Sequence, residues 1–239
     1  MKLLFTCEHG GNRIPARYAA LFRSHRRELD SHLGYDPGAL VYARELARAF
    51  EAELISATTS RLVVELNRSL HHPRVFSRIT RTLPADERQC IVERHYEPYR
   101  TRVETRVRDA ARAGERLLHV SCHSFTPRLD GVVRAADIGL LYDPRREGEA
   151  RFCRTWQSVL ERLAPQWRVR RNYPYRGSDD GLTTYLRSRF NGRVYRGVEI
   201  EVNQRFPSGD AREWRSMRRL LIESLREMLS TASSMLHDR

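Results

Sequence analysis

Histidine, carboxylate and guanidinium side chains recur where the predicted strands of this chain end. His9 closes the first apolar run, Asn67 and Arg68 close a second, His123 closes a third and Glu201 closes a late one. A sheet needs no such residues for its stability. Ligands of open α/β sheets bind outside the carboxyl ends of the strands, so the recurrence predicts one shared site at that edge.

His9 and His123 are the natural metal ligands of this set. Neutral imidazole suits zinc, and a catalytic zinc ion usually takes three protein ligands and a water. The third ligand should be a carboxylate, and the candidates are Asp36, Glu8 and, more weakly, the amide of Asn12. Asp36 also fits the N-cap of the helix that follows it, which is a structural explanation for the same residue. For each histidine the alternative is a buried, hydrogen-bonded structural role.

Glu201 is the candidate general base. A carboxylate beside a zinc-bound water can take its proton, because zinc lowers the pKa of that water to about 7. Glu199 shares a face of the predicted strand with Glu201 and is the competing candidate. Arg61 and Arg68, with Asn67, could clamp a substrate carboxylate, because a guanidinium fork matches it with two hydrogen bonds. The alternative for any single arginine is a solvent-exposed surface role.

The elements that must position these residues alternate between strands and helices. Helical spacing of apolar residues predicts helices over residues 36–50, 84–113, 147–163, 183–189 and 210–230. Apolar runs predict a strand from residue 3 to the histidine at 9, and strands over 53–57, 60–68, 117–125, 137–142, 167–170 and 194–202. The alternation predicts an α/β protein with one mostly parallel sheet covered on both faces. Without an internal repeat or a linker, residues 1–239 should form a single domain.

The charge of the chain is strongly positive. Its 43 basic residues, nearly all arginine, produce a formal net charge of +13. An anionic partner such as nucleic acid is one explanation, and helix faces solvated with arginine are the other. We expect no nucleic-acid partner, because the sequence contains no nucleic-acid-binding module.

Four cysteines, at positions 7, 90, 122 and 153, show no paired spacing. The first residues form a core strand and not a signal peptide, so reduced thiols in a cytoplasm are the simplest interpretation. No apolar run approaches the length needed to span a bilayer. We therefore expect a cytoplasmic protein without a membrane-spanning segment.

Seven short motifs follow one another from about residue 3 to residue 206. They are Cys-Glu-His-Gly-Gly-Asn, Tyr-Asp-Pro-Gly-Ala, Val-Val-Glu-Leu-Asn-Arg, Cys-His-Ser-Phe-Thr-Pro, Asp-Ile-Gly-Leu-Leu-Tyr-Asp, Asn-Tyr-Pro-Tyr and Val-Glu-Ile-Glu-Val-Asn-Gln. In this order, which is what makes them specific, the motifs resemble the N-formylglutamate amidohydrolase family. The family is similar to the zinc carboxypeptidases and aspartoacylases, which implies a three-layer α/β/α, phosphorylase/hydrolase-like fold.

The resemblance implies a role for each matching position. His9 and His123 would be the first and last zinc ligands, and Glu201 would be the catalytic glutamate. Asn67 and Arg68 would hold the carboxylate of the substrate. Arg61 would assist them and polarise the scissile carbonyl. Two residues of the turn-rich loop would line the substrate side, where they could belong to a mobile cover, namely Tyr175 and Asp180.

One position departs from the pattern of these relatives. Carboxypeptidases and aspartoacylases place a glutamate ligand three residues after the first histidine, and here that position is Asn12. Asp36 is the best substitute. The resemblance then implies one Zn²⁺ ion bound by His9, Asp36 and His123, and hydrolysis of an acidic N-acyl amino acid, by default N-formylglutamate. The alternatives are a carboxypeptidase-like or deacylase activity on another N-acyl amino acid or peptide, and, ranked low, a basic nucleic-acid-binding protein without catalysis.

Overall fold

The computed structural model describes residues 1–237, which are organised around one central sheet. In this part of the chain the sheet has six strands in the order β2-β1-β3-β8-β6-β7. Neighbouring strands are parallel except β6 and β8, which are antiparallel. The predicted mostly parallel sheet is therefore confirmed. Its strands are β1 (Lys2–Cys7), β2 (Glu53–Ser56), β3 (Leu117–Phe125), β6 (Ile138–Leu141), β7 (Val169–Arg171) and β8 (Tyr195–Asn203).

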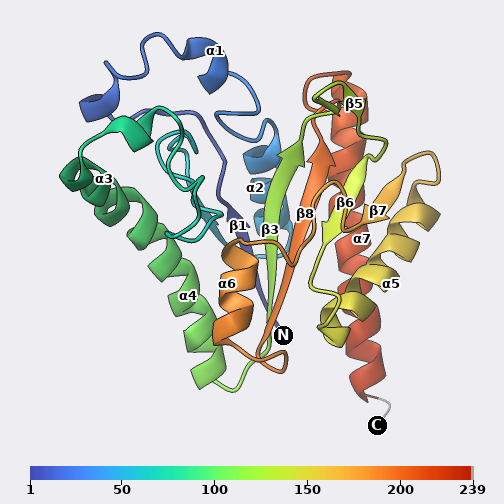
Figure 1. Ribbon diagram of the computed structural model, residues 1–239. Coiled ribbons are helices and arrows are strands. Elements are labelled where there is room, and N and C mark those ends of the chain that lie inside the picture. Colours follow the sequence, from blue (N-terminus) through green and yellow to red (C-terminus); the bar gives the residue numbers. More distant parts are fainter. Residues whose placement is uncertain (238–239) are drawn as a thin grey trace.

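Helices cover both faces of the sheet (Figure 1). On one face α2 (Ala39–Ala49), α5 (Glu147–Leu163) and α7 (Ala211–His237) pack in one buried apolar cluster with the sheet. On the other face α4 (Glu97–Arg112) and α6 (Leu182–Arg189) belong to a second cluster. The arrangement confirms the three-layer α/β/α architecture. No helix in the described residues combines the length and the apolar character needed to cross a membrane.

Shorter elements complete the fold. The chain forms a small antiparallel hairpin directly after β3, made of β4 (Arg128–Leu129) and β5 (Val132–Val133). The remaining short helices are η1 (Ala16–Tyr18), α1 (Arg26–Leu29), η2 (Thr80–Thr82), α3 (Ala85–Ile91) and the π-helical turn η3 (Val92–Tyr96), which leads into α4.

Strand β8 shows how the sheet presents polar groups inside a buried layer. Val198, Ile200 and Val202 belong to the apolar cluster under α2, α5 and α7. Successive side chains of a strand point to opposite faces, so Glu199 and Glu201 face the other way. In the parallel register Glu201 lies opposite His123 of β3. The carboxyl ends of β3 and β8 thus bring an imidazole and a carboxylate together.

The prediction of a strand over residues 60–68 is wrong. The segment forms turns, in which the amide of Val63 donates to the carbonyl of Ser60. Its apolar side chains are buried against the α4 side without joining the sheet, whose edge on this side is β2. The alternation of polar and apolar residues had a different cause, because the polar residues Arg61, Glu65 and Asn67 bind groups of the site and of α6.

The prediction that Asp36 caps α2 is also wrong. The N-cap is Gly38, whose φ of +80° is a conformation that glycine adopts without steric cost. Asp36 lies two residues earlier, and its amide donates to the carbonyl of His9 over 2.9 Å. The carboxylate of Asp36 is therefore free of the helix and points into the site.

Candidate metal centre and active site

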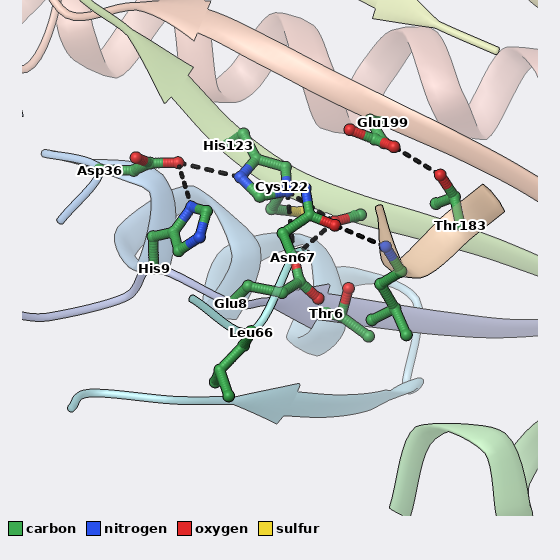
Figure 2. A network of polar contacts seen from close by, with 12 residues as sticks. Thr6, Glu8, His9, Asp36, Leu66, Asn67, Cys122, His123, Thr183 and Glu199 are labelled. Atoms are coloured by element: carbon green, nitrogen blue, oxygen red, sulfur yellow. Dashed lines mark hydrogen bonds and ion pairs between the residues drawn. The ribbon is translucent and has the colours of Figure 1, made fainter. Parts of the chain in front are cut away.

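His9, Asp36 and His123 meet at the carboxyl edge of the sheet. His9 follows β1, Asp36 precedes α2, and His123 lies near the end of β3 (Figure 2). The Asp36 oxygen Oδ2 lies 3.2 Å from Nδ1 of His9 and 2.9 Å from Nδ1 of His123. All three side chains are buried, and their ligand atoms lie within 4.8 Å of one another. Such a group could hold a metal ion.

A glutamate contacts the second ring nitrogen of each histidine. Nε2 of His123 lies 3.0 Å from Oε2 of Glu8, and Nε2 of His9 contacts Oε1 of Glu65. Glu8 also accepts hydrogen bonds from Tyr99 (2.8 Å) and Ser121 (2.6 Å). Carboxylates behind metal-binding histidines set the orientation of the ring and its tautomer. Both rings therefore turn Nδ1 toward Asp36.

The other two candidates for the third ligand lie elsewhere. Glu8 is on the far side of the His123 ring from Asp36. Asn12 donates its side-chain amide to Asp30 over 2.9 Å at an exposed position. Of the three candidates, Asp36 is the one that lies between both histidines.

The cluster carries strong mutual electrostatic effects. Burial by itself raises the pKa of Asp36, but His9 and His123 outweigh it and hold that pKa well below its usual range. Burial lowers the pKa of His123, but its hydrogen bonds to Asp36 and Glu8 raise the pKa well above the usual value. For His9, burial and Arg61 lower the pKa, whereas Glu65 and Asp36 raise it, with a net rise. Without a metal, both shifts favour the protonated form of the two histidines.

Glu201 and Glu199 differ in their partners, although they share a face of β8. Thr183 donates a hydrogen bond to Glu199 (Figure 2). Within the described residues, Oε2 of Glu201 is buried and has no hydrogen-bond partner. Burial, with the charges of Asp36 and Glu199, raises the pKa of Glu201 to about 8. A buried carboxylate oxygen without a partner is costly, and a cation or water beside it would remove that cost.

Arg61 bridges two carboxylates of the site. Its Nε donates to Oε2 of Glu65 over 2.7 Å, and its Nη1 donates to Oδ1 of Asp36 over 3.3 Å. The side chain is still 30% exposed, so a ligand can reach it. Glu65 is the site residue that the sequence analysis missed. The one available signal was its place on the same predicted face as Arg61, four residues away.

The structure places Asn67, Arg68 and Asp180 together beside α6. The side-chain oxygen of Asn67 accepts the amide of Leu182 over 2.7 Å, which ties it to the start of that helix. Arg68 donates to the carbonyl of Asp180, and the Asp180 carboxylate accepts the amide of Ser69 over 3.0 Å. These contacts attach the loop of residues 172–181 to the segment of residues 67–69.

Tyr175 lies on the other arm of the same loop. Arg134 donates to its hydroxyl over 3.0 Å. Burial and the charge of Glu201 raise the pKa of Tyr175, against the opposing charges of Arg134 and Arg61. The loop of residues 172–181 therefore reaches from the segment of residues 67–69 to the β4–β5 hairpin, alongside Glu201.

Solved structures with this fold include two informative relatives. A gene product of Agrobacterium tumefaciens is 30% identical, with a TM-score of 0.83, over 97% of this chain and 92% of that one. The N-formylglutamate amidohydrolase from Ralstonia eutropha JMP134 is 18% identical, with a TM-score of 0.71, over 98% and 95% of the two chains, and shows that the fold is shared. A comparison with curated proteins found no match.

A comparison with models of protein families agrees with the resemblance of the motifs. The model of the N-formylglutamate amidohydrolase family matches residues 1–206, which include every residue of the candidate site. That match covers most of the 239 residues. The chain belongs to the N-formylglutamate amidohydrolase family.

Proposed function

We propose that this protein is a zinc-dependent amidohydrolase that cleaves N-formylglutamate into formate and glutamate. The observation that carries the proposal is the buried group of His9, Asp36 and His123 beside the unpartnered carboxylate of Glu201. Two imidazoles and a carboxylate are a donor set that zinc accepts in catalytic sites. The family supports amide hydrolysis, and the site supports a metal as the means.

His9, Asp36 and His123 would hold one zinc ion, each through a single atom. When bound, zinc supplies Lewis-acid chemistry, which acidifies water and polarises a carbonyl oxygen. His9 and His123 would each lose a proton on binding the ion, because a zinc ligand nitrogen is unprotonated. Glu201, whose buried carboxylate has no partner within the described residues, would be favoured in its ionised form by a cation held beside it.

Glu201 acts as the general base and then as the general acid. It takes one proton from the attacking water, whose oxygen forms the new bond to the carbonyl carbon of the substrate. As the C–N bond breaks, Glu201 returns that proton to the leaving nitrogen, which becomes the amine of glutamate. Arg61 stabilises the negative charge that develops on the carbonyl oxygen. Asn67 and Arg68 anchor the α-carboxylate, while Tyr175 and Asp180 line the substrate side.

The variant Glu201→Gln tests this proposal, with Glu199→Gln as the matched variant on the same face of β8. We expect Glu201→Gln to bind zinc in the same ratio as the unmodified protein and to lose about 10²–10⁴-fold in the rate of formate release. Glu199→Gln should lose far less. Formate release measures the rate, and elemental analysis measures zinc. Full activity in zinc-loaded Glu201→Gln would show that another group is the base.

Removal of the metal with a chelator is a second test of the proposed function. Removal of zinc should abolish hydrolysis of N-formylglutamate, and zinc added back should restore it. N-acetyl and peptide substrates, run in parallel, separate the formyl-specific activity from a broader deacylase or carboxypeptidase-like activity. Hydrolysis that persists without any bound metal would contradict the metal-dependent mechanism.

A further inference from the structure

The β4–β5 hairpin brings an arginine to the rim of the candidate site. Figure 1 shows the hairpin beyond the ends of β3 and β8. Arg134 directly follows β5, and its amide donates to the carbonyl of Pro127 over 2.8 Å, which closes the hairpin at its base. Its Nη1 donates to the Tyr175 hydroxyl, and its guanidinium carbon lies 5.0 Å from the centre of the Tyr175 ring. These contacts fix the direction of the side chain.

The loop that holds Arg134 is packed against the strand of the proposed base. Gly139 of β6 lies opposite Glu201 in the sheet. A Cβ atom at Gly139 would lie 2.2 Å from the carbonyl oxygen of Tyr173 and 3.2 Å from Cβ of Glu201. Ala135, the neighbour of Arg134, donates its amide to the Tyr173 hydroxyl over 3.1 Å. The rim, the loop and the strand of Glu201 are therefore in direct contact.

The guanidinium of Arg134 keeps an unpaired positive charge. Within residues 1–237, its side chain contacts a neutral hydroxyl and an aromatic ring and forms no ion pair. Arg61, by contrast, is paired with Glu65 and Asp36. A guanidinium has five N–H donors, and Arg134 uses one of them on Tyr175. The remaining donors are available to an anionic ligand.

We propose that Arg134 binds the side-chain carboxylate of the substrate and so selects acidic N-acyl amino acids. The inference rests on the proposed function. An acidic N-acyl amino acid carries two carboxylates. The loop of residues 172–181 is contacted by two guanidinium groups at different points, by Arg68 at Asp180 and by Arg134 at Tyr175. One guanidinium then serves each carboxylate, with Arg134 able to form two parallel hydrogen bonds.

The test compares Arg134→Gln with Arg128→Gln, a control in the same hairpin. Arg128 is exposed and donates to the carbonyl of Gly131. The substrates are N-formylglutamate and N-formylglutamine, which has the same shape without the second charge. Arg134→Gln should raise KM for N-formylglutamate by about 10–100-fold, the effect expected for a lost charged hydrogen bond. In Arg134→Gln, KM for N-formylglutamine and kcat for both substrates should stay the same. Arg128→Gln should leave KM and kcat unchanged for both substrates.

A purely structural role for Arg134 predicts a different pattern. If Arg134 only holds Tyr175 in place, Arg134→Gln will raise KM equally for both substrates, and that result would overturn the inference. Arg134→Lys, which keeps the charge, should recover part of the affinity for N-formylglutamate.

Calorimetry with glutarate separates this inference from the proposed function. We expect the zinc-loaded protein to bind glutarate, and Arg134→Gln to bind it more weakly. Equal binding by both proteins, or no binding by either, would overturn the role of Arg134. If the unmodified protein hydrolyses neither formyl substrate, the proposed function fails, and the glutarate measurement still decides the role of Arg134.

Discussion

The two histidines of the candidate metal centre are supported in the same manner. Glu8 holds the ring of His123 from behind, and Glu65 does the same for His9. Arg61 in turn holds Glu65, so that the orientation of His9 depends on a chain of three charged side chains. An outer partner of this kind acts on metal affinity through the ring that it orients.

Replacement of Glu65 by glutamine should therefore weaken zinc binding by about 10–100-fold. The amide keeps the shape of the side chain but loses the charge that favours this orientation of His9. Competition with a chromophoric chelator measures the affinity. Glu87→Gln removes a carboxylate that pairs with Arg17 at the surface, and it should leave the affinity unchanged. Unaltered zinc affinity in Glu65→Gln would mean that His9 is oriented without Glu65.

At the scale of elements, the turn before α2 determines where Asp36 lies. Gly38 has a φ of +80°, and a Cβ atom there would lie 2.7 Å from Cβ of Pro207. Either the turn around Gly38 or Pro207 must therefore shift if residue 38 gains a side chain. Because the positive φ also strains a residue with a side chain, we expect the turn to shift and Asp36, two residues away, to move with it.

We expect Gly38→Ala to lower the free energy of unfolding by roughly 1–3 kcal/mol and to weaken zinc binding as well. Gly114→Ala is the matched control, because Gly114 has a φ of +68° but nothing lies within 4 Å of its Cβ position. The control should lose some stability and keep its zinc affinity. Denaturant titration and the chelator assay check both effects. Equal zinc affinity in the two variants would show that the turn does not control Asp36.

The sequence was sufficient for the elements with strong periodicity. Strands β1, β3 and β8 were predicted from their apolar runs, and the long helices were predicted because their apolar residues repeat at helical spacing. Residues 60–68 were predicted wrongly as a strand, because alternation alone cannot distinguish a strand from a turn-rich segment whose apolar side chains are also buried. The deciding contact there joins Glu65 to His9, 56 residues away, and local patterns hold no information on such a pair.

In the candidate site, too, some residues could be predicted from local sequence patterns and others could not. His9, His123 and Glu201 could be predicted because each lies near a strand end, where the fold brings polar groups together. Asp36 was named as the substitute for the glutamate ligand that the relatives carry and this chain lacks, and the role of helix cap that the sequence also offered for it was wrong. Arg134 offered no signal, because the chain has many arginines and the hairpin that places this one is only two residues long on each side.

For the whole molecule, the buried charges make stability depend on pH when no metal is bound. The folded state raises the pKa of His9 and His123 above 6.5, and burial raises that of Glu201 to about 8. Each group then binds its proton more tightly when folded than when unfolded. The stabilisation by the histidines is complete below pH 6.5 and is lost as the pH rises through their folded pKa values, and the contribution of Glu201 declines in the same direction up to about pH 8.

The zinc-free protein should therefore have a Tm several degrees lower at pH 8.5 than at pH 6.5. Thermal unfolding in the presence of a chelator measures this difference. The zinc-loaded protein serves as the control, and its Tm should not fall between pH 6.5 and pH 8.5. Zinc competes with protons for the same nitrogens and binds better as the pH rises. A zinc-free Tm that is constant or rises over this range would contradict the assigned protonation of the histidines.

The separation of the three candidate ligands along the chain also bears on the order of assembly. Asp36 lies 27 residues from His9 and 87 residues from His123, and His123 belongs to a strand that must first pair with β1. No short peptide of this chain contains His9, Asp36 and His123 together. Bringing them together costs loop-closure entropy, and formation of the sheet offsets that cost before the three side chains can bind one ion. If the proposed zinc ion binds here, we expect it to bind only after the sheet has formed, so that it stabilises the folded protein without nucleating the fold.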